Sequence, residues 1–123
     1  MLKHITTCLA LLAVPTVAED LPQAITCYQT STNAEDIDAY MACFTPDAEM
    51  IDVSRTFNGA EAIRAWSLRE VMPIGTSFAH RKILEQSEGY AKTEVNWLSW
   101  VAHYSYWWNG DGLITRVSLQ YAD

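Results

Sequence analysis

The apolar residues near the start of the chain recur at helical spacing. After Asp20 and Pro22, a stripe at i, i+3, i+4 and i+7 predicts a helix to about Thr32; its members are Leu21, Ala24, Ile25 and Tyr28. A second stripe predicts a helix that Asn33 caps and residues 45–47 stop; it consists of Ile37, Tyr40, Met41 and Phe44. Because the turn between them is short, the two helices are expected to be antiparallel neighbours.

The middle of the chain combines a short strand with a third helix. Residues 48–53 form the expected strand. The run Asn58-Gly59-Ala60-Glu61 predicts a capping box, and the helix behind it carries Ala62, Ile63 and Trp66. Pro73 and Gly75 are expected to end this helix.

From residue 76 onward the pattern changes to strands rich in aromatic and β-branched residues. The strands are expected at about 76–86, 90–98, 100–108 and 113–121, with clear turns at 87–89 and 109–112 and a less defined join at 98–100. Helices followed by a long antiparallel meander indicate an α+β domain whose curved sheet wraps around the helices. Such a cone would enclose an apolar hollow.

The first eighteen residues have the pattern of a secretory signal peptide. Lys3 precedes an apolar run from Ile5 to Val17, and small residues lead to Ala18, after which we expect cleavage. A membrane anchor is the alternative, but about thirteen apolar residues are too few to span a bilayer that needs roughly twenty. The mature protein is therefore expected to be a single domain over 19–123, periplasmic or secreted.

Charge narrows the range of partners. The chain has 15 acidic and 8 basic side chains and a formal charge of −7, and loss of Lys3 would make it −8. The pair Arg81-Lys82 is the main basic cluster, so nucleic acid and anionic membrane surfaces would be repelled. We expect no nucleic-acid partner, and no membrane association after signal cleavage.

Two cysteines, Cys27 and Cys43, remain after the expected cleavage. An oxidising compartment favours a disulfide between them, which would close a loop of about sixteen residues and contribute on the order of 3 kcal/mol. Two buried thiols are the alternative. A cysteine nucleophile is less favoured, because no histidine lies nearby in the sequence.

Four short segments carry a resemblance to a known family. They are Tyr28-Gln29-Thr30-Ser31-Thr32-Asn33, Asp36-Ile37-Asp38-Ala39, Phe44-Thr45-Pro46-Asp47-Ala48 and Asn58-Gly59-Ala60-Glu61-Ala62-Ile63-Arg64. The chain resembles the NTF2-like superfamily in its SnoaL-like branch over nearly all of the mature length. The resemblance implies a conical α+β fold and a homodimer. It does not choose an activity, because this fold hosts isomerases, cyclases, hydrolases, carriers and proteins without chemistry.

Asp52 is the sharpest chemical feature. On a strand of period 2 it shares a face with Met50 and Ala48, and burial on that apolar face would strengthen its carboxylate as a base. The alternative is a strand-end aspartate that accepts backbone hydrogen bonds or pairs with Arg55. Tyr28 precedes Asp52 by twenty-four residues, which resembles the ketosteroid isomerases; that resemblance implies Asp52 as base and Tyr28 as oxyanion donor.

The resemblance to the ketosteroid isomerases weakens at their third catalytic residue, which is neither the base nor the tyrosine. The neutral carboxylic acid that those isomerases carry on the penultimate strand falls near Tyr104, and the strand here has no acid. Tyr104 could donate a hydrogen bond, but a buried tyrosine on a strand is more typical of a core residue. His103 and His80 lie on predicted strands, and each could line the hollow as a proton carrier or simply bond to a neighbour. Met50, Trp66 and Tyr104 are the expected pocket-lining residues. No histidine or thiol has metal-ligand spacing, so neither metal nor cofactor is expected.

Rings lie on both faces of the strand expected at 100–108, with Trp107 on one face and Tyr104, Tyr106 and Trp108 on the other. One face should line the core, and the other indicates a homodimer that packs through the sheet, or rings covered by the N-terminal segment. Three functions remain open. The domain binds a small, largely apolar ligand; or it is an enzyme that abstracts a proton beside a carbonyl with Asp52, Tyr28 and His103, as an isomerase, cyclase or dehydratase; or it is a non-catalytic interaction dimer.

Overall fold

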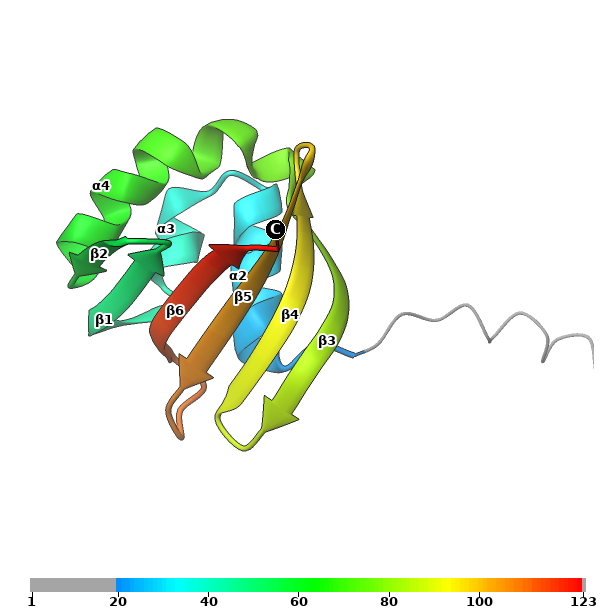
Figure 1. Cartoon of the computed structure of the whole chain (residues 1–123). Helices are drawn as coiled ribbons and strands as arrows, with labels where there is room; N and C mark the ends of the chain where they lie inside the picture. The colour runs from blue at the N-terminus through cyan, green and yellow to red at the C-terminus, as the bar shows by residue number, and fades with distance from the viewer. Residues whose placement is uncertain (1–19, 123) are drawn as a thin grey trace, which may run out of the picture.

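A computed structural model describes residues 20–122 of the chain. Figure 1 shows helices and a curved sheet in one body. The helical elements are α2 (Gln23–Asn33), α3 (Ile37–Met41), α4 (Ala60–Glu70) and the 3-10 helix η3 (Met72–Ser77). The strands are β1 (Phe44–Asp52), β2 (Arg55–Asn58), β3 (Ala79–Ser87), β4 (Tyr90–Trp97), β5 (Trp100–Trp108) and β6 (Ile114–Tyr121). The expected signal peptide and its cleavage site lie outside the described residues.

The six strands form one sheet in the order β2-β1-β6-β5-β4-β3. Neighbours are antiparallel except β1 and β6, which run parallel. The sheet curves, and α2 and α3 lie against its concave side while α4 crosses one end (Figure 1). The expected α+β architecture, with helices packed against a curved, mostly antiparallel sheet, is confirmed.

The first helix forms where its apolar stripe predicts. Pro22 precedes α2, and Ala24, Ile25 and Tyr28 are buried on the face that meets the sheet. The strands β4, β5 and β6 bury alternate residues, as expected for a sheet with one covered face. Helix and sheet therefore share one core, and the inner face of the sheet meets the buried face of α2.

The second helix differs from the prediction. Asp36 caps it, accepting a hydrogen bond from the Ala39 N–H at 3.1 Å, and the helix ends at Met41 after five residues. Asn33 is instead the last residue of α2, and its side-chain amide donates to the carbonyl oxygens of Gly75 and Phe78. The Asn33 side chain therefore bonds α2 to the backbone at Gly75 and Phe78 and does not cap α3.

Two further details around α4 were predicted wrongly. Gly59 is the N-cap of α4 and no side chain caps the helix, because Asn58 is the last residue of a short strand that the sequence pattern did not predict. That strand pairs with β1, which itself begins four residues earlier than expected, at Phe44. Pro73 and Gly75 lie in η3, after α4 has ended at Glu70.

The expected disulfide between Cys27 and Cys43 is present and joins α2 to the start of β1. None of the helices among residues 20–122 is long and apolar enough to span a membrane.

Candidate functional site

The expected site residues can be placed through the register of the sheet. Asp52 on β1 is the Cα partner of Leu119 on β6, Leu119 is the partner of Tyr104 on β5, and Tyr104 is the partner of Thr93 on β4. All four are buried. One row across four strands therefore carries a carboxylate and two hydroxyls on the inner face of the sheet.

Asp52 lies on the apolar face that the sequence predicted, since Ala48 and Met50 are also buried. Its carboxylate is not alone there. Arg55, three residues later, forms an ion pair with Asp52. Its guanidinium also donates two hydrogen bonds, of 2.7 and 3.0 Å, to the carboxylate of Glu70 on α4. The arrangement matches the alternative in which Asp52 pairs with Arg55, with Glu70 added.

These charges act on one another. Hydrogen bonding to Arg55 lowers the pKa of Glu70, and the carboxylates of Glu70 and Asp52 raise the pKa of Arg55. Asp52 is the least exposed of the three side chains, at 11 %, against 34 % for Glu70 and 48 % for Arg55. Arg55 therefore joins a nearly buried carboxylate to the end of α4 at the surface.

Tyr28 lies at the centre of the core, fully buried. Its ring centroid is 5.0–6.1 Å from five other rings, which are those of Tyr40, Phe44, Phe78, Tyr104 and Tyr106. At the level of Tyr28 these rings fill the space between α2 and the sheet.

A chain of buried hydroxyls ends on Tyr28. Ser67 of α4 donates to the Tyr40 hydroxyl at 2.9 Å, and Tyr40 donates to the Tyr28 hydroxyl at 3.2 Å. Burial is the main reason why the pKa of Tyr28 lies well above its ordinary value, and burial raises the pKa of Tyr40 to about 12. Both phenols therefore stay protonated at neutral pH and can donate hydrogen bonds.

Tyr104 differs from Tyr28 because its buried hydroxyl has no hydrogen-bond partner among the described residues. Burial raises the pKa of Tyr104, the nearby Tyr106 and Tyr40 add to this, and the neighbouring Tyr28 hydroxyl opposes it. The Thr93 hydroxyl and the indole N–H groups of Trp97 and Trp66 are also buried and have no partner within residues 20–122. An unpaired buried polar group costs about 1–3 kcal/mol, so such groups usually mark a place for water or a ligand.

Three of these groups lie together. Thr93 faces Tyr104 across β4 and β5, and the ring of Trp97, also on β4, is 6.2 Å from that of Tyr104. We call Tyr104, Thr93 and Trp97 the donor triplet. Trp66 is on α4, where its ring stacks on Phe57 at 5.6 Å.

The other expected site residues are divided between the two faces of the sheet. Met50 is fully buried and lies one inner-face position before Asp52 on β1. His103 has the opposite parity to Tyr104 on β5, and its Nε2 lies 3.6 Å from the Glu94 carboxylate. The structure therefore does not bring His103 together with Asp52 and Tyr28.

His80 lies on the helix-facing side instead. Its ring nitrogens contact the Gln29 side-chain oxygen and, at 3.1 Å, the Tyr106 hydroxyl. Burial lowers the pKa of His80 to about 4, so the ring is neutral at pH 7. It ties α2 to β3 and β5.

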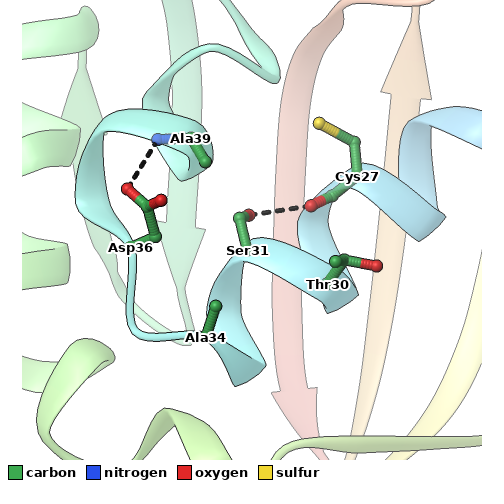
Figure 2. A pocket seen from close by; sticks show the side chains of 6 residues that line it. All are labelled: Cys27, Thr30, Ser31, Ala34, Asp36 and Ala39. Atoms are coloured by element: carbon green, nitrogen blue, oxygen red, sulfur yellow. Dashed lines mark hydrogen bonds between the residues drawn. The ribbon is translucent and has the colours of Figure 1, made fainter.

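The surface pockets formed by residues 20–122 include three at separate places on the fold. The one in Figure 2, of about 280 Å³, lies over α2 and α3 and is lined by Cys27, Thr30, Ser31, Ala34, Asp36 and Ala39. The second, about 430 Å³, lies at Trp100 and Tyr121, and the third, about 380 Å³, lies at the turns around Gly89 and Asn109. Asp52, Tyr28 and Tyr104 line none of these three. Within residues 20–122, no three metal-ligating side chains are grouped to hold an ion.

Sequence reasoning missed several residues of this region. Ser67 occupies a buried position four residues after Ile63 on α4, and a serine on an apolar helix stripe is a signal that could have been used. Glu70, Thr93 and Trp97 gave no comparable signal, because their roles depend on how α4 and the strands pack.

No protein-family model and no curated protein matches the chain. Solved structures do. A SnoaL-like protein of unknown function from Burkholderia thailandensis matches with a TM-score of 0.71 and 17 % identity, over 82 % of this chain and 93 % of its own. A candidate polyketide cyclase from Sinorhizobium meliloti matches with a TM-score of 0.64 and 26 % identity, over 82 % and 96 %.

An NTF2-like protein of unknown function from Cytophaga hutchinsonii also matches. Its TM-score is 0.65 at 12 % identity, and the match covers 85 % of this chain and 92 % of that one. At such low identities these likenesses establish how the chain is folded and leave its activity to be argued from its own residues.

Proposed function

Because the chain has the NTF2-like fold of SnoaL-like proteins, we propose that it uses the inner face of the sheet to bind a small, largely apolar molecule that carries a hydrogen-bond acceptor. The observation that carries the proposal is the buried Tyr104 hydroxyl, which, like the neighbouring Thr93 hydroxyl and Trp97 N–H, has no hydrogen-bond partner in the part of the chain that the structure describes. The rings of Phe78 and Trp97 pack against that of Tyr104, so a ligand that reaches the donor triplet would meet mostly apolar surface.

The chemistry of the donor triplet defines the polar part of the ligand. An indole N–H only donates, and the two hydroxyls can each donate. A carbonyl or hydroxyl oxygen would satisfy these groups, whereas a hydrocarbon would leave them unpaired. Discrimination between two such ligands comes from the cost of leaving buried donors without an acceptor.

Binding can be tested with 2-naphthol and naphthalene, which differ by one oxygen, followed by tryptophan fluorescence. The proposal expects 2-naphthol to bind more tightly than naphthalene, and Tyr104→Phe to weaken 2-naphthol by about tenfold while leaving naphthalene unchanged. Tyr90→Phe is the matched control, because Tyr90 is on the outer face and its hydroxyl bonds to Glu85. Equal affinities for both compounds, or no saturable binding, would contradict the proposal.

A second candidate is proton abstraction beside a carbonyl, with Asp52 as base and Tyr28 as oxyanion donor. The observation that favours it is the inner-face row that joins Asp52 to Tyr104, against which the Tyr28 ring packs at 6.0 Å. Arg55 opposes it by occupying the carboxylate. The test is isomerisation of cyclohex-3-enone to cyclohex-2-enone, in which the base moves one proton from C2 to C4; Asp52→Asn should abolish it, and absence of turnover by the wild type excludes this role.

We further propose that a second copy of the chain packs on the outer face of the sheet. That face carries Tyr90, Trp107 and Arg116, with the Arg116 guanidinium 5.2 Å from the Trp107 ring centroid. Light scattering after size exclusion should give twice the monomer mass, and Trp107→Glu should give the monomer. A wild type that stays monomeric at high concentration contradicts this, and would also remove the interaction-dimer alternative.

Export is the remaining proposal. The Cys27–Cys43 disulfide fits an oxidising compartment such as the periplasm or the exterior. For protein made in an exporting host, the intact mass should equal that of a chain whose first residue is Glu19. An N terminus at Met1 would contradict cleavage after Ala18.

A further inference from the structure

The two ends of the sheet have opposite turn chemistry. At one end, the turns at Glu88-Gly89 and at Asn109–Leu113 place glycines at the left-handed positions, and the Asn109 side chain accepts from two backbone N–H groups. This is the polar chemistry that tight turns favour. At the other end, two turns use apolar residues.

Val53 and Leu98 are the first residues of those two turns, and the backbone φ of each is +58°. A left-handed φ is unfavourable for residues other than glycine or asparagine, and most of all for a β-branched valine. Both side chains are nevertheless exposed, Val53 at 42 % and Leu98 at 53 %, so packing within the domain does not repay the strain. The pairs Asp52–Arg55 and Trp97–Trp100 close two-residue hairpins, which themselves require a left-handed φ. The turns do not require an exposed valine or leucine at that position, so the choice of these apolar residues points to a role outside the fold.

Trp100 and Tyr121 lie at the same end. Tyr121 ends β6, one inner-face position beyond Leu119, and Trp100 starts β5, two inner-face positions beyond Tyr104. Their rings are 5.9 Å apart, and both remain nearly half exposed. Four of the six large apolar side chains that the described residues expose therefore gather here, and we call Val53, Leu98, Trp100 and Tyr121 the apolar strand end.

We propose that the apolar strand end docks onto the surface of a zwitterionic lipid bilayer. Tryptophan and tyrosine prefer the interface between headgroups and acyl chains, and small apolar tips can enter it. The inference concerns an outer surface and does not depend on what the donor triplet binds.

Charge favours a neutral lipid surface. The charged side chains beside this end pair with one another, Arg55 with Asp52 and Glu70, and Arg69 with Glu70. Paired charges cost less to bring to a membrane than isolated ones. With a formal charge of −7, the chain as a whole would be repelled by anionic lipid. The expectation of no membrane association after signal cleavage rests on that repulsion, and the present proposal departs from it because a zwitterionic surface carries no net charge.

Size disfavours a protein partner. A stable protein interface uses about 20–30 residues on each side, whereas the apolar strand end offers four exposed side chains. Shallow insertion into lipid has no such requirement, because each apolar side chain contributes by its own transfer from water.

The test is sedimentation with phosphatidylcholine vesicles, using protein whose N terminus has been read by intact mass. The double variant Val53→Asn, Leu98→Asn places a residue that tolerates left-handed φ at both turns. It should keep or raise the unfolding midpoint and yet bind vesicles about tenfold more weakly. Leu84→Thr, which removes a leucine exposed at 38 % on β3, should leave binding unchanged.

Several results would overturn the proposal. The wild type could stay in the supernatant, the Leu84→Thr variant could lose binding as much as the double variant, or binding could require phosphatidylglycerol. Wild-type dimers that form without lipid and dissociate in the double variant would assign the apolar strand end to a second copy of the chain instead.

Discussion

Tyr104 on β5 and Thr93 on β4 are directly paired on adjacent strands, and each buries a side-chain hydroxyl that has no hydrogen-bond partner among residues 20–122. Two such groups side by side, with the Trp97 N–H nearby, would together cost several kcal/mol, which is a large part of the stability of a small domain. An acceptor that enters from outside the chain removes that cost, and this links the fold to ligand binding.

The ion pair between Arg55 and Asp52 predicts how substitutions at these two residues change the stability of the fold. Arg55→Gln leaves the nearly buried Asp52 carboxylate without its positive partner, so the unfolding midpoint should fall. Adding Asp52→Asn to that variant should restore part of the loss, because no uncompensated charge remains. Arg69→Gln, which removes a contact of 3.5 Å to Glu70, is the control and should change the midpoint little. Equal effects of Arg55→Gln and Arg69→Gln would contradict this account.

His80 predicts a pH dependence of stability. Its pKa is about 4 in the folded protein and close to 6.5 when unfolded, so the unfolded chain binds more protons between these values. Stability should be complete above pH 6.5 and decline as the pH falls towards 4, by at most about 3 kcal/mol. Denaturant titrations of the wild type and His80→Gln should show that this part of the decline disappears in the variant. If His80→Gln keeps the wild-type slope while His103→Gln loses it, the wrong histidine has been assigned.

At Gly75, η3 lies so close to α2 that there is no room for a side chain. A Cβ at this position would lie 2.2 Å from the Thr32 carbonyl oxygen, closer than atoms can approach. Gly75→Ala should therefore lower the free energy of unfolding by about 1–3 kcal/mol. At Gly110 a Cβ would meet nothing within 4 Å, so Gly110→Ala is the control. A Gly75→Ala protein as stable as the Gly110→Ala protein would show that η3 moves freely.

The disulfide predicts a sensitivity to reductant. Cys27 and Cys43 are 16 residues apart, and closing a loop of this length stabilises the fold by about 3 kcal/mol in the chain-entropy view. Reduction should add the mass of two hydrogen atoms and lower the unfolding midpoint of the wild type. The Cys27→Ala, Cys43→Ala variant should unfold earlier and be unaffected by reductant; a midpoint equal to that of the oxidised wild type would contradict the expected contribution.

Local patterns foretold most of the fold. The stripe ending at Tyr28 and the alternation along residues 90–121 each describe one face of one element, and periodicity reports that directly. The strand Arg55–Asn58 was not foreseen. It has one apolar residue, Phe57, and its turn lacks the glycine or asparagine that usually marks a hairpin.

The site was foreseen less completely. Burial of Asp52 follows from the strand period, and Arg55 is close enough in sequence to be considered as a partner. Glu70 is fifteen residues from Arg55, and their contact exists only because α4 packs beside the turn between β1 and β2. Likewise, nothing in the sequence marks Thr93 or Trp97 as unpartnered, because that property depends on the whole packing around them.

The binding account can be tested most directly by diffraction from crystals soaked in 2-naphthol. The account predicts electron density for the ligand in the interior, with its oxygen within hydrogen-bond distance of the Tyr104 hydroxyl. Density for ordered water alone at Tyr104, or a Tyr104 hydroxyl that remains without any partner after soaking, would contradict it.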